Sequence, residues 1–320
     1  MVHRLSRFVL PFSCACALAG AALPSTAAAK LAVGISDNGP AMFSQHNFLR
    51  LNLTVARDMV PWNAAITGDK STLHAAQAWV KAAQNAGVQP MISFTAPGGP
   101  SGNYVPSTKV YTAAIKAFLH SVPSVKTYAP WNEPDWIYRP KLARNPRLAA
   151  SYFNALTRWC KHCTIVAGDV YLPARQLGPW IRAYERGLTS RPKAWALHNY
   201  YDVRTHSSAQ LQTMQALTSG QIWLTEISGV IRRGHWQFRN QSPAAAAKDE
   251  SYLFSMAKRF HRIARIYHYQ WQGTIDTAST GWDSGLIGPG GVPRPAYWAV
   301  AKVTGLRHTT RHTTRHTSRH

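Results

Sequence analysis

The chain has 320 residues, of which 45% are hydrophobic and 15% are charged, so it is long enough to bury a large core. Its 36 lysines and arginines outnumber its 13 aspartates and glutamates, which gives a formal net charge of +23. Beyond the first 29 residues no run is long and apolar enough to span a bilayer, which excludes a membrane-embedded protein.

The first 29 residues have the pattern of a secretory signal. Arg4 and Arg7 precede an apolar stretch, Phe8–Leu23, and the small residues Ala27–Ala29 fit a cleavage site. An uncleaved anchor is the alternative, which Pro11 and the small polar residues within the stretch disfavour. We therefore expect a secreted, extracellular protein, associated with the cell wall and without stable membrane insertion.

Eight apolar runs are expected to be β-strands, and several are apolar on both faces, which is typical of a parallel sheet covered by helices. In chain order they are Leu31–Ile35, Thr54–Val60, Val88–Phe94, Val125–Pro130, Thr164–Val170, Ala194–His198, Gln221–Thr225 and Ile266–Trp271. Helical periodicity marks seven stretches between and after them: Leu73–Ala86, Tyr111–His120, Leu148–Trp159, Gln176–Arg186, Ala209–Leu217, Ala244–Arg262 and Pro295–Val303.

Strand and helix alternate across residues 30–306, although the first crossover holds only a short helix candidate at residues 43–49. Eight alternations over this length predict an α/β fold, a single-domain (β/α)8 TIM barrel, rather than an open doubly wound sheet. No glycine-rich dinucleotide or phosphate-binding motif opens a helix after a strand.

The last 14 residues, 307–320, repeat Arg-His-Thr-Thr and form a basic tail. On a helix the four histidines of this tail would share one face and could bind a transition metal. The β-branched threonines and the lack of an apolar face favour a disordered tail instead.

Most of the positive charge belongs to the region between the ends, since the signal and the tail together carry only six arginines. This basicity suits nucleic acid, acidic polysaccharide, or an anionic wall or membrane surface. A genome rich in arginine codons, with no selected partner, is the alternative.

Two cysteines remain after the signal, in Cys160-Lys161-His162-Cys163. In a cytosolic protein this spacing would suggest redox chemistry or half a zinc site. No second pair exists, and the expected compartment is oxidising, so a local disulfide between Cys160 and Cys163 is the favoured interpretation.

The sequence holds only four glutamates, and two of them close strand-like runs beside tryptophan. Glu133 follows the fourth run and Glu226 ends the seventh. In a parallel barrel, the carboxyl ends of strands four and seven face each other across the mouth. Glycoside cleavage needs two such carboxylates, one to protonate the leaving oxygen and one to attack the anomeric carbon or activate water.

The stretch Trp131-Asn132-Glu133-Pro134, together with Thr225-Glu226, resembles the clan A (4/7 superfamily) retaining glycoside hydrolases, which are TIM barrels. Within this clan, the sequence is compatible both with a family 39-like and with a family 128-like enzyme. The resemblance implies that Glu133 is the general acid/base, Glu226 the nucleophile, and Asn132 a ligand of the sugar 2-hydroxyl. The enzyme would be a glycosidase that acts on a poly- or oligosaccharide and needs no metal or organic cofactor.

The same resemblance extends to residues on other strands. His198 would contact the sugar, Tyr200 would hydrogen-bond the nucleophile, and Arg57 would hold the nucleophile ionised. Trp271 would form an aromatic platform, with Trp131, Trp62 and Trp136 as further candidates. The alternatives are that Arg57 pairs with Asp58 or another barrel carboxylate, and that His198 and Trp271 belong to the core.

Basic residues follow strand four (Arg139, Lys141, Arg144) and strand seven (Arg232, Arg233, Arg239, with Trp236 and Phe238 between them). We expect these loops to flank the cleft and the substrate to be anionic, such as a uronate-containing glycan. The main alternative is a non-catalytic barrel that binds cell-wall glycans. A nucleic-acid-binding protein is disfavoured by the signal and by the lack of a nucleic-acid module, and a monomer is expected.

Overall fold

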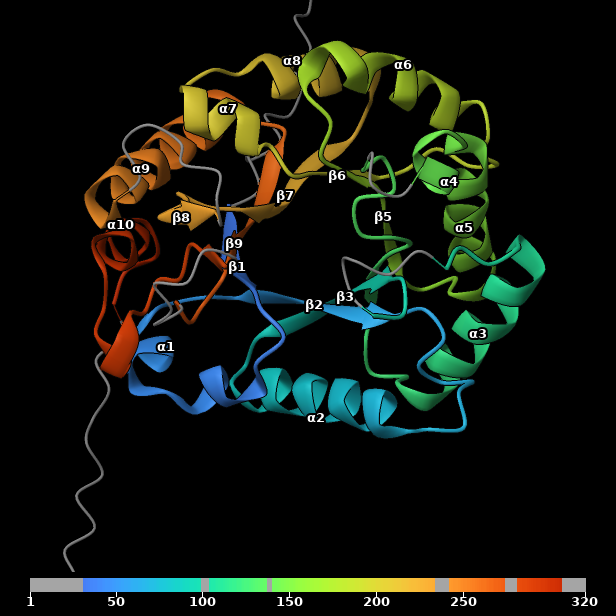
Figure 1. Ribbon diagram of the computed structural model, residues 1–320, viewed down its shortest axis with the longest axis horizontal. Coiled ribbons are helices and arrows are strands. Elements are labelled where there is room, and N and C mark those ends of the chain that lie inside the picture. Colours follow the sequence, from blue (N-terminus) through green and yellow to red (C-terminus); the bar gives the residue numbers. More distant parts are fainter. Residues whose placement is uncertain (1–30, 99–103, 137–139, 234–241, 274–280, 307–320) are drawn as a thin grey trace, which may run out of the picture.

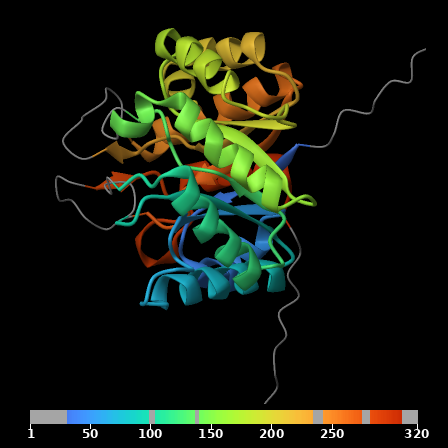
Figure 2. The ribbon, with the colours of Figure 1, turned by 90° about the vertical axis from the view of Figure 1, so that its right-hand side faces the viewer.

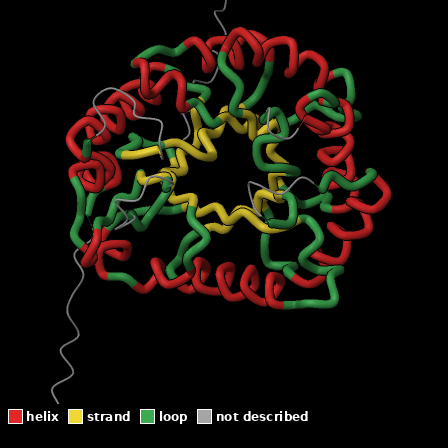
Figure 3. The backbone as a smooth tube through the Cα atoms, in the orientation of Figure 1, coloured by secondary structure: helices red, strands yellow, loops and turns green. Residues whose placement is uncertain are grey.

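The computed structural model of the chain describes residues 31–98, 104–136, 140–233, 242–273 and 281–306. Within these residues, eight parallel strands close into a barrel, and helices surround it (Figures 1 and 3). The predicted (β/α)8 TIM barrel is therefore confirmed. The predicted signal and the basic tail lie outside the described residues.

The strands of the barrel are neighbours in chain order, and the last pairs with the first. They are β1 (Ala32–Ser36), β2 (Val55–Pro61), β3 (Gln89–Thr95), β4 (Thr127–Ala129), β5 (Thr164–Val170), β6 (Ala194–Leu197), β7 (Gln221–Ile227) and β9 (Ile263–Tyr269). Two further short strands, β8 (Arg232–Arg233) and β10 (Trp282–Asp283), pair antiparallel in the loops after β7 and β9.

Helices cover the outside of the barrel, and Figure 2 shows two of them, α3 and α5, side by side on the outer surface. The α-helices are α1 (His46–Arg50), α2 (Ser71–Asn85), α3 (Thr108–Ser121), α4 (Pro140–Ala143), α5 (Pro146–Trp159), α6 (Ala174–Glu185), α7 (Tyr200–Thr205), α8 (Ala209–Leu217), α9 (Pro243–Arg259) and α10 (Pro295–Thr304). None of the helices in the described ranges is long and apolar enough to cross a membrane.

Three of the long helices begin at a side-chain cap. Ser107, Asn145 and Ser242 accept hydrogen bonds from the backbone N–H groups of Val110, Leu148 and Ala245. Each cap satisfies a backbone donor that the helix leaves free and contributes about 1 kcal/mol. Helix α9 begins at Pro243, one residue before the predicted stretch Ala244–Arg262, and the short crossover before β2 contains a 3-10 turn and α1.

The barrel interior has two layers, which decide where the chemistry can lie. The layer toward the strand N-termini is largely apolar and contains Val55, Met91, Ala129, Val166, Ala194, Ala196, Trp223 and Tyr267. Residues two apart on a strand share a face, so the next inward positions on β2, β3 and β7 are Arg57, Ser93 and Thr225, all buried. The interior therefore becomes polar at the C-terminal ends of the strands.

Candidate active site

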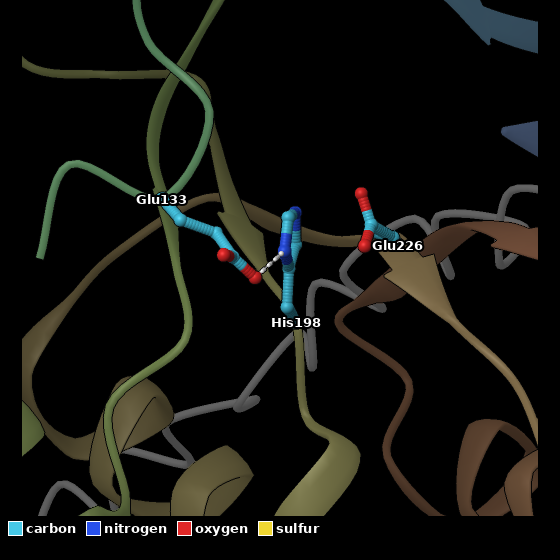
Figure 4. A group of neighbouring side chains, drawn as sticks. All are labelled: Glu133, His198 and Glu226. Atoms are coloured by element: carbon cyan, nitrogen blue, oxygen red, sulfur yellow. Dashed lines mark hydrogen bonds and ion pairs between the residues drawn. The ribbon is translucent and has the colours of Figure 1, made fainter. Parts of the chain in front are cut away.

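Glu133 lies on the loop that follows β4, and this loop is held by backbone hydrogen bonds on both sides. The N–H of Asn132 donates to the Phe94 carbonyl at 2.7 Å, and the N–H of Glu133 donates to the Asp169 carbonyl at 3.0 Å. Glu133 has a φ of +46°, a left-handed conformation that is uncommon for residues other than glycine. Its side chain is 14% exposed and points toward His198 (Figure 4).

Asp135, for which the sequence suggested no role, anchors the same loop. Its carboxylate accepts hydrogen bonds from the backbone N–H groups of Tyr171 and Leu172, which follow β5. Burial raises the pKa of Asp135 to about 7, opposed by the hydrogen bond from Leu172. The Glu133 loop and the loop after β5 are therefore joined directly beneath the barrel mouth.

Glu226 lies near the end of β7 and is bound by the residues that the resemblance pointed to. Arg57 Nη1 donates to Glu226 Oε2 at 3.0 Å, and the Tyr200 hydroxyl donates to Oε1 at 3.4 Å. Burial raises the pKa of Glu226 above its ordinary value, while the charges of His198 and Arg57 oppose this rise. Arg57 thus favours the ionised form of Glu226, but burial has the larger effect on its pKa.

Asp169, which follows Gly168 on β5, is the centre of the buried network. Its carboxylate accepts hydrogen bonds from Arg57 Nη2 (2.9 Å), Ser93 Oγ (2.6 Å), His198 and Thr225. Burial alone would raise its pKa, but the charges of Arg57 and His198 hold the pKa well below its usual range. Asp169 therefore remains ionised and fixes four side chains from four different strands or strand ends.

His198 lies between the two glutamates, as Figure 4 shows. Its Nδ1 is 3.0 Å from Glu133 Oε1, and its Nε2 is 3.0 Å from Asp169 Oδ1. Burial would lower the pKa of His198, but the Asp169 and Glu226 carboxylates outweigh it and raise the pKa to about 10. The raised pKa favours the protonated ring, which can donate from both nitrogens, and the fully buried side chain orients Glu133.

The three residues of Figure 4 are also the group with metal-ligand potential. Glu133, His198 and Glu226 each offer one ligand atom, and these atoms all lie within 4.8 Å of one another. A histidine that binds a metal must be a neutral imidazole with a free lone pair, whereas both nitrogens of His198 face carboxylates, and the raised pKa of the ring favours its protonated form. The geometry therefore suits proton transfer between opposed carboxylates better than metal binding.

Three of the four tryptophans predicted as aromatic platforms are buried, whereas Trp136 is half-buried. Trp271 is 1% exposed, its ring packs against Phe48 and Tyr297, and its Nε1 donates to Gln45 Oε1. Trp131 is also 1% exposed and stacks on Tyr152, and Trp62 is similarly buried. A buried indole offers no face to a ligand, so these three tryptophans belong to the core.

Two half-buried aromatic residues lie close to Glu226 or to its partner Tyr200. Tyr269 ends β9 on the inward row, and Trp282 on β10 lies edge-on to Tyr200, with ring centroids 5.1 Å apart. Tyr269 also contacts Trp282, at 6.2 Å between centroids. Burial raises the pKa of Tyr269, and the nearby Glu226 carboxylate adds to this rise. Tyr269 and Trp282 are thus the aromatic residues of the site that sequence inspection did not identify.

Asn132 is buried, and its Oδ1 accepts a 2.5 Å hydrogen bond from Arg57 Nη2. This contact fixes the orientation of the Asn132 amide group. Away from the site, Cys160 and Cys163 form a disulfide in the turn before β5.

Of the residues expected to flank the cleft, Lys141 donates a hydrogen bond to the Val105 carbonyl. Two of the basic residues, Arg139 and Arg239, and the aromatic residues Trp236 and Phe238 lie outside the described residues.

The raised pKa of His198 predicts how the free energy of unfolding depends on pH. The unfolded imidazole has a pKa of about 6.5, so between about 6.5 and 10 the folded state binds a proton that the unfolded state has lost. This stabilisation is complete below the unfolded value and is lost as pH rises through the folded one. The free energy of unfolding should therefore fall with a slope approaching about 1.4 kcal/mol per pH unit.

Urea unfolding over this pH range measures the slope. His198→Gln should remove it, whereas His206→Gln, at a histidine whose side chain is 49% exposed, should leave it in place. An equal slope in the wild type and in His198→Gln would contradict the assignment.

The chain matches the protein family described as the glycosyl hydrolase catalytic core over residues 103–296, a segment that contains both Glu133 and Glu226. A comparison with curated protein sequences gives no match.

Among solved structures, the chain is similar to a family 39 glycoside hydrolase from the gut symbiont Bacteroides cellulosilyticus WH2. The identity is 15% and the TM-score 0.61, over 86% of this chain and 64% of that one. A family 5 (subfamily 18) protein from Streptomyces cattleya, in complex with Manβ1-4GlcNAc, is 12% identical, with a TM-score of 0.63 over 86% of this chain and 80% of that one. A family 128 (subgroup I) endo-β-1,3-glucanase from Amycolatopsis mediterranei is 16% identical, with a TM-score of 0.54 over 84% and 98%.

Proposed function

The chain belongs to the glycosyl hydrolase catalytic core family and is a glycosidase, and from this premise we propose that it is a secreted retaining enzyme. It cleaves the O-glycosidic bonds of a poly- or oligosaccharide, with Glu133 as acid/base and Glu226 as nucleophile. The barrel has the architecture of the clan A glycoside hydrolases. The basic composition and the signal-like first 29 residues support an extracellular site of action on an acidic or wall-linked glycan.

The separation of the two glutamates carries this proposal. One oxygen of Glu133 and one of Glu226 lie within 4.8 Å of each other. Retaining glycosidases hold their two carboxyl groups about 5–5.5 Å apart, whereas inverting enzymes need about 6.5–9.5 Å to admit a water between carboxylate and sugar. The separation here lies closer to the retaining range than to the inverting range, which favours direct attack by Glu226.

The reaction then proceeds in two displacements. Glu133 donates a proton to the glycosidic oxygen while Glu226 attacks the anomeric carbon, so that the carbon–oxygen bond breaks and a glycosyl ester forms. In the second step Glu133, now a carboxylate, takes a proton from water, and the water oxygen attacks the anomeric carbon. The ester bond breaks, which restores the Glu226 carboxylate and the Glu133 acid.

Each neighbouring side chain supports one of these two roles. Arg57 and Tyr200 bind the two oxygens of Glu226 and orient it for attack. His198 occupies Glu133 Oε1, which leaves Oε2 to carry the proton toward the leaving group. Asp169 holds both Arg57 and His198, so the acid/base and the nucleophile are positioned by one buried carboxylate.

A panel of neutral and uronate-containing glycans, scored for release of reducing ends, tests the proposal. Glu133→Ala and Glu226→Ala are the matched controls for contaminating activity. On a cleaved substrate, proton NMR of the first product should show the anomeric configuration of the original linkage. An inverted first product would contradict the double displacement, and no release from any member of the panel would contradict hydrolysis.

A further inference from the structure

A groove runs along the outer face of α5, away from the barrel mouth. It has a volume of about 570 Å³, which falls within the range of known ligand pockets. Its walls come from α3, α5, the turn that holds Lys161, and the loop at residues 189–190. Figures 1 and 2 show α3 and α5 as neighbours on the outside of the barrel.

The groove is lined by hydroxyl groups and has a fixed framework. Thr108 and Ser151 hydrogen-bond each other across the two helices at 2.7 Å. Asn154 on α5 donates to the Gly187 carbonyl and accepts from the Thr189 backbone N–H, which fixes the third wall. The hydroxyl of Thr157, which lies in the groove wall, is buried and has no hydrogen-bond partner among the described residues.

One end of the groove combines an aromatic side chain with positive charge. Trp159 is 45% exposed, and Lys116 Nζ lies 3.8 Å from its ring centroid, which holds the indole in place. Arg158 and Lys161 also line the groove, and no acidic residue does. Catalysis uses none of these residues, because α5 ends at the N-terminal side of β5, opposite the strand ends that carry the site.

We propose that this groove is a second, non-catalytic binding site for an acidic polysaccharide. Serine, threonine and asparagine side chains suit the hydroxyl groups of a sugar, the open part of Trp159 suits its apolar face, and the cations suit its carboxylates. The site anchors the enzyme to the polymer while the barrel mouth cleaves elsewhere. The assignment of this second site depends on the proposed function only because it takes a glycan as the ligand.

Affinity electrophoresis through polygalacturonate tests the groove, with the methyl-esterified polymer as the uncharged comparison. All variants are made in a Glu226→Gln background, so binding is measured without turnover. Arg158→Ala/Lys161→Ala and Trp159→Ala should each weaken binding to polygalacturonate about tenfold. The methyl-esterified polymer should bind weakly to all of them.

Matched controls lie on the other side of the barrel. Lys258→Ala/Arg259→Ala removes the same charge from α9, and Trp298→Ala removes an indole that is 49% exposed on α10; both should change binding less than twofold. Equal losses in the control and groove variants, or no loss in either, would overturn the proposal. So would tighter binding of single-stranded DNA that depends on Trp159.

In the active chain, Trp159→Ala should keep the wild-type kcat/KM on a short soluble substrate. Because the binding assay requires no turnover, a failure of hydrolysis and a failure of the groove give separate results.

Discussion

Replacing Glu226 with alanine is expected to lower kcat by about four to six orders of magnitude, the scale seen when a catalytic nucleophile is removed. Among the described residues, neither nearby carboxylate can take its place: Asp169 is fully buried and accepts four hydrogen bonds, and Glu133 lies on the opposite side of His198 (Figure 4). The variant should still fold, because the truncation removes a side chain that is 12% exposed at the barrel mouth.

Glu133→Ala should behave differently, because the first step needs less acid help when the leaving group is good. With an activated aryl glycoside, the first step should persist and the glycosyl ester should accumulate, since Glu133 is no longer present to activate water. Steady-state turnover should then be slow after a rapid burst of aryl alcohol. Glu185→Ala is the matched control, because Glu185 lies on α6, outside the site.

Sodium azide separates the two roles by stereochemistry. In Glu226→Ala, azide can occupy the space left by the carboxylate and attack the anomeric carbon once, which gives a glycosyl azide of inverted configuration. In Glu133→Ala, azide attacks the glycosyl ester from the opposite face, so that two inversions give net retention. Product NMR distinguishes these outcomes, and the reverse pattern would show that the two glutamates have exchanged roles.

The barrel could be predicted because its strands carry apolar residues on both faces, and the run at Thr164–Val170 coincides with β5. The fourth run is the exception, since β4 contains only Thr127–Ala129. Pro130, which follows it, has no N–H to continue the ladder, so the strand ends early and the Glu133 loop begins there. Helix α7 was also missed, because its six residues are too few for periodicity to identify.

The sequence could not predict the central role of Asp169. Val166 faces the barrel interior, so strict alternation places Gly168 inward and Asp169 outward. The register shifts between Gly168 and Val170, and both Gly168 and Asp169 have positive φ values, +85° and +63°. This bulge turns the Asp169 side chain into the barrel, and no local sequence pattern predicts the bulge.

Trp271 fails as a platform for a related reason. Tyr267 and Tyr269 alternate correctly on β9, and extending the pattern puts Trp271 on the same inward row. The strand ends at Tyr269, however, and beyond that residue the direction of a side chain is set by tertiary contacts. The indole then packs against Phe48 of α1 and Tyr297 of α10 instead.

Arg57→Met should be the most destabilising substitution in the site, by about 3–5 kcal/mol, because it keeps the volume but leaves two buried carboxylates without their cation. Arg57 donates to both Asp169 and Glu226 and is fully buried. Urea unfolding at neutral pH measures this loss. Arg57→Lys keeps the charge but cannot bind both carboxylates in the fork geometry, so it should recover only part of the stability.

The pH dependence of unfolding identifies the carboxylate concerned. The low pKa of Asp169 stabilises the wild type above the unfolded value of about 3.9, and this stabilisation is lost as pH falls below it. In Arg57→Met this loss at acid pH should be smaller, because less of the stabilisation is present to begin with. If Arg57→Met lost as much unfolding free energy at acid pH as the wild type, a role for the Arg57–Asp169 pair would be contradicted.

The double variant Arg57→Met/Asp169→Asn separates the structural role of the network from its catalytic role. In the double variant, position 169 carries a neutral amide, so no unpaired carboxylate is left when Arg57 is removed. Its loss of unfolding free energy should therefore be smaller than the sum of the two single losses by about 0.5–3 kcal/mol. Turnover should not recover with it, because Glu226 still lacks the guanidinium that orients it. Strictly additive losses, or recovery of both properties together, would show that Asp169 and Arg57 do not act as one unit.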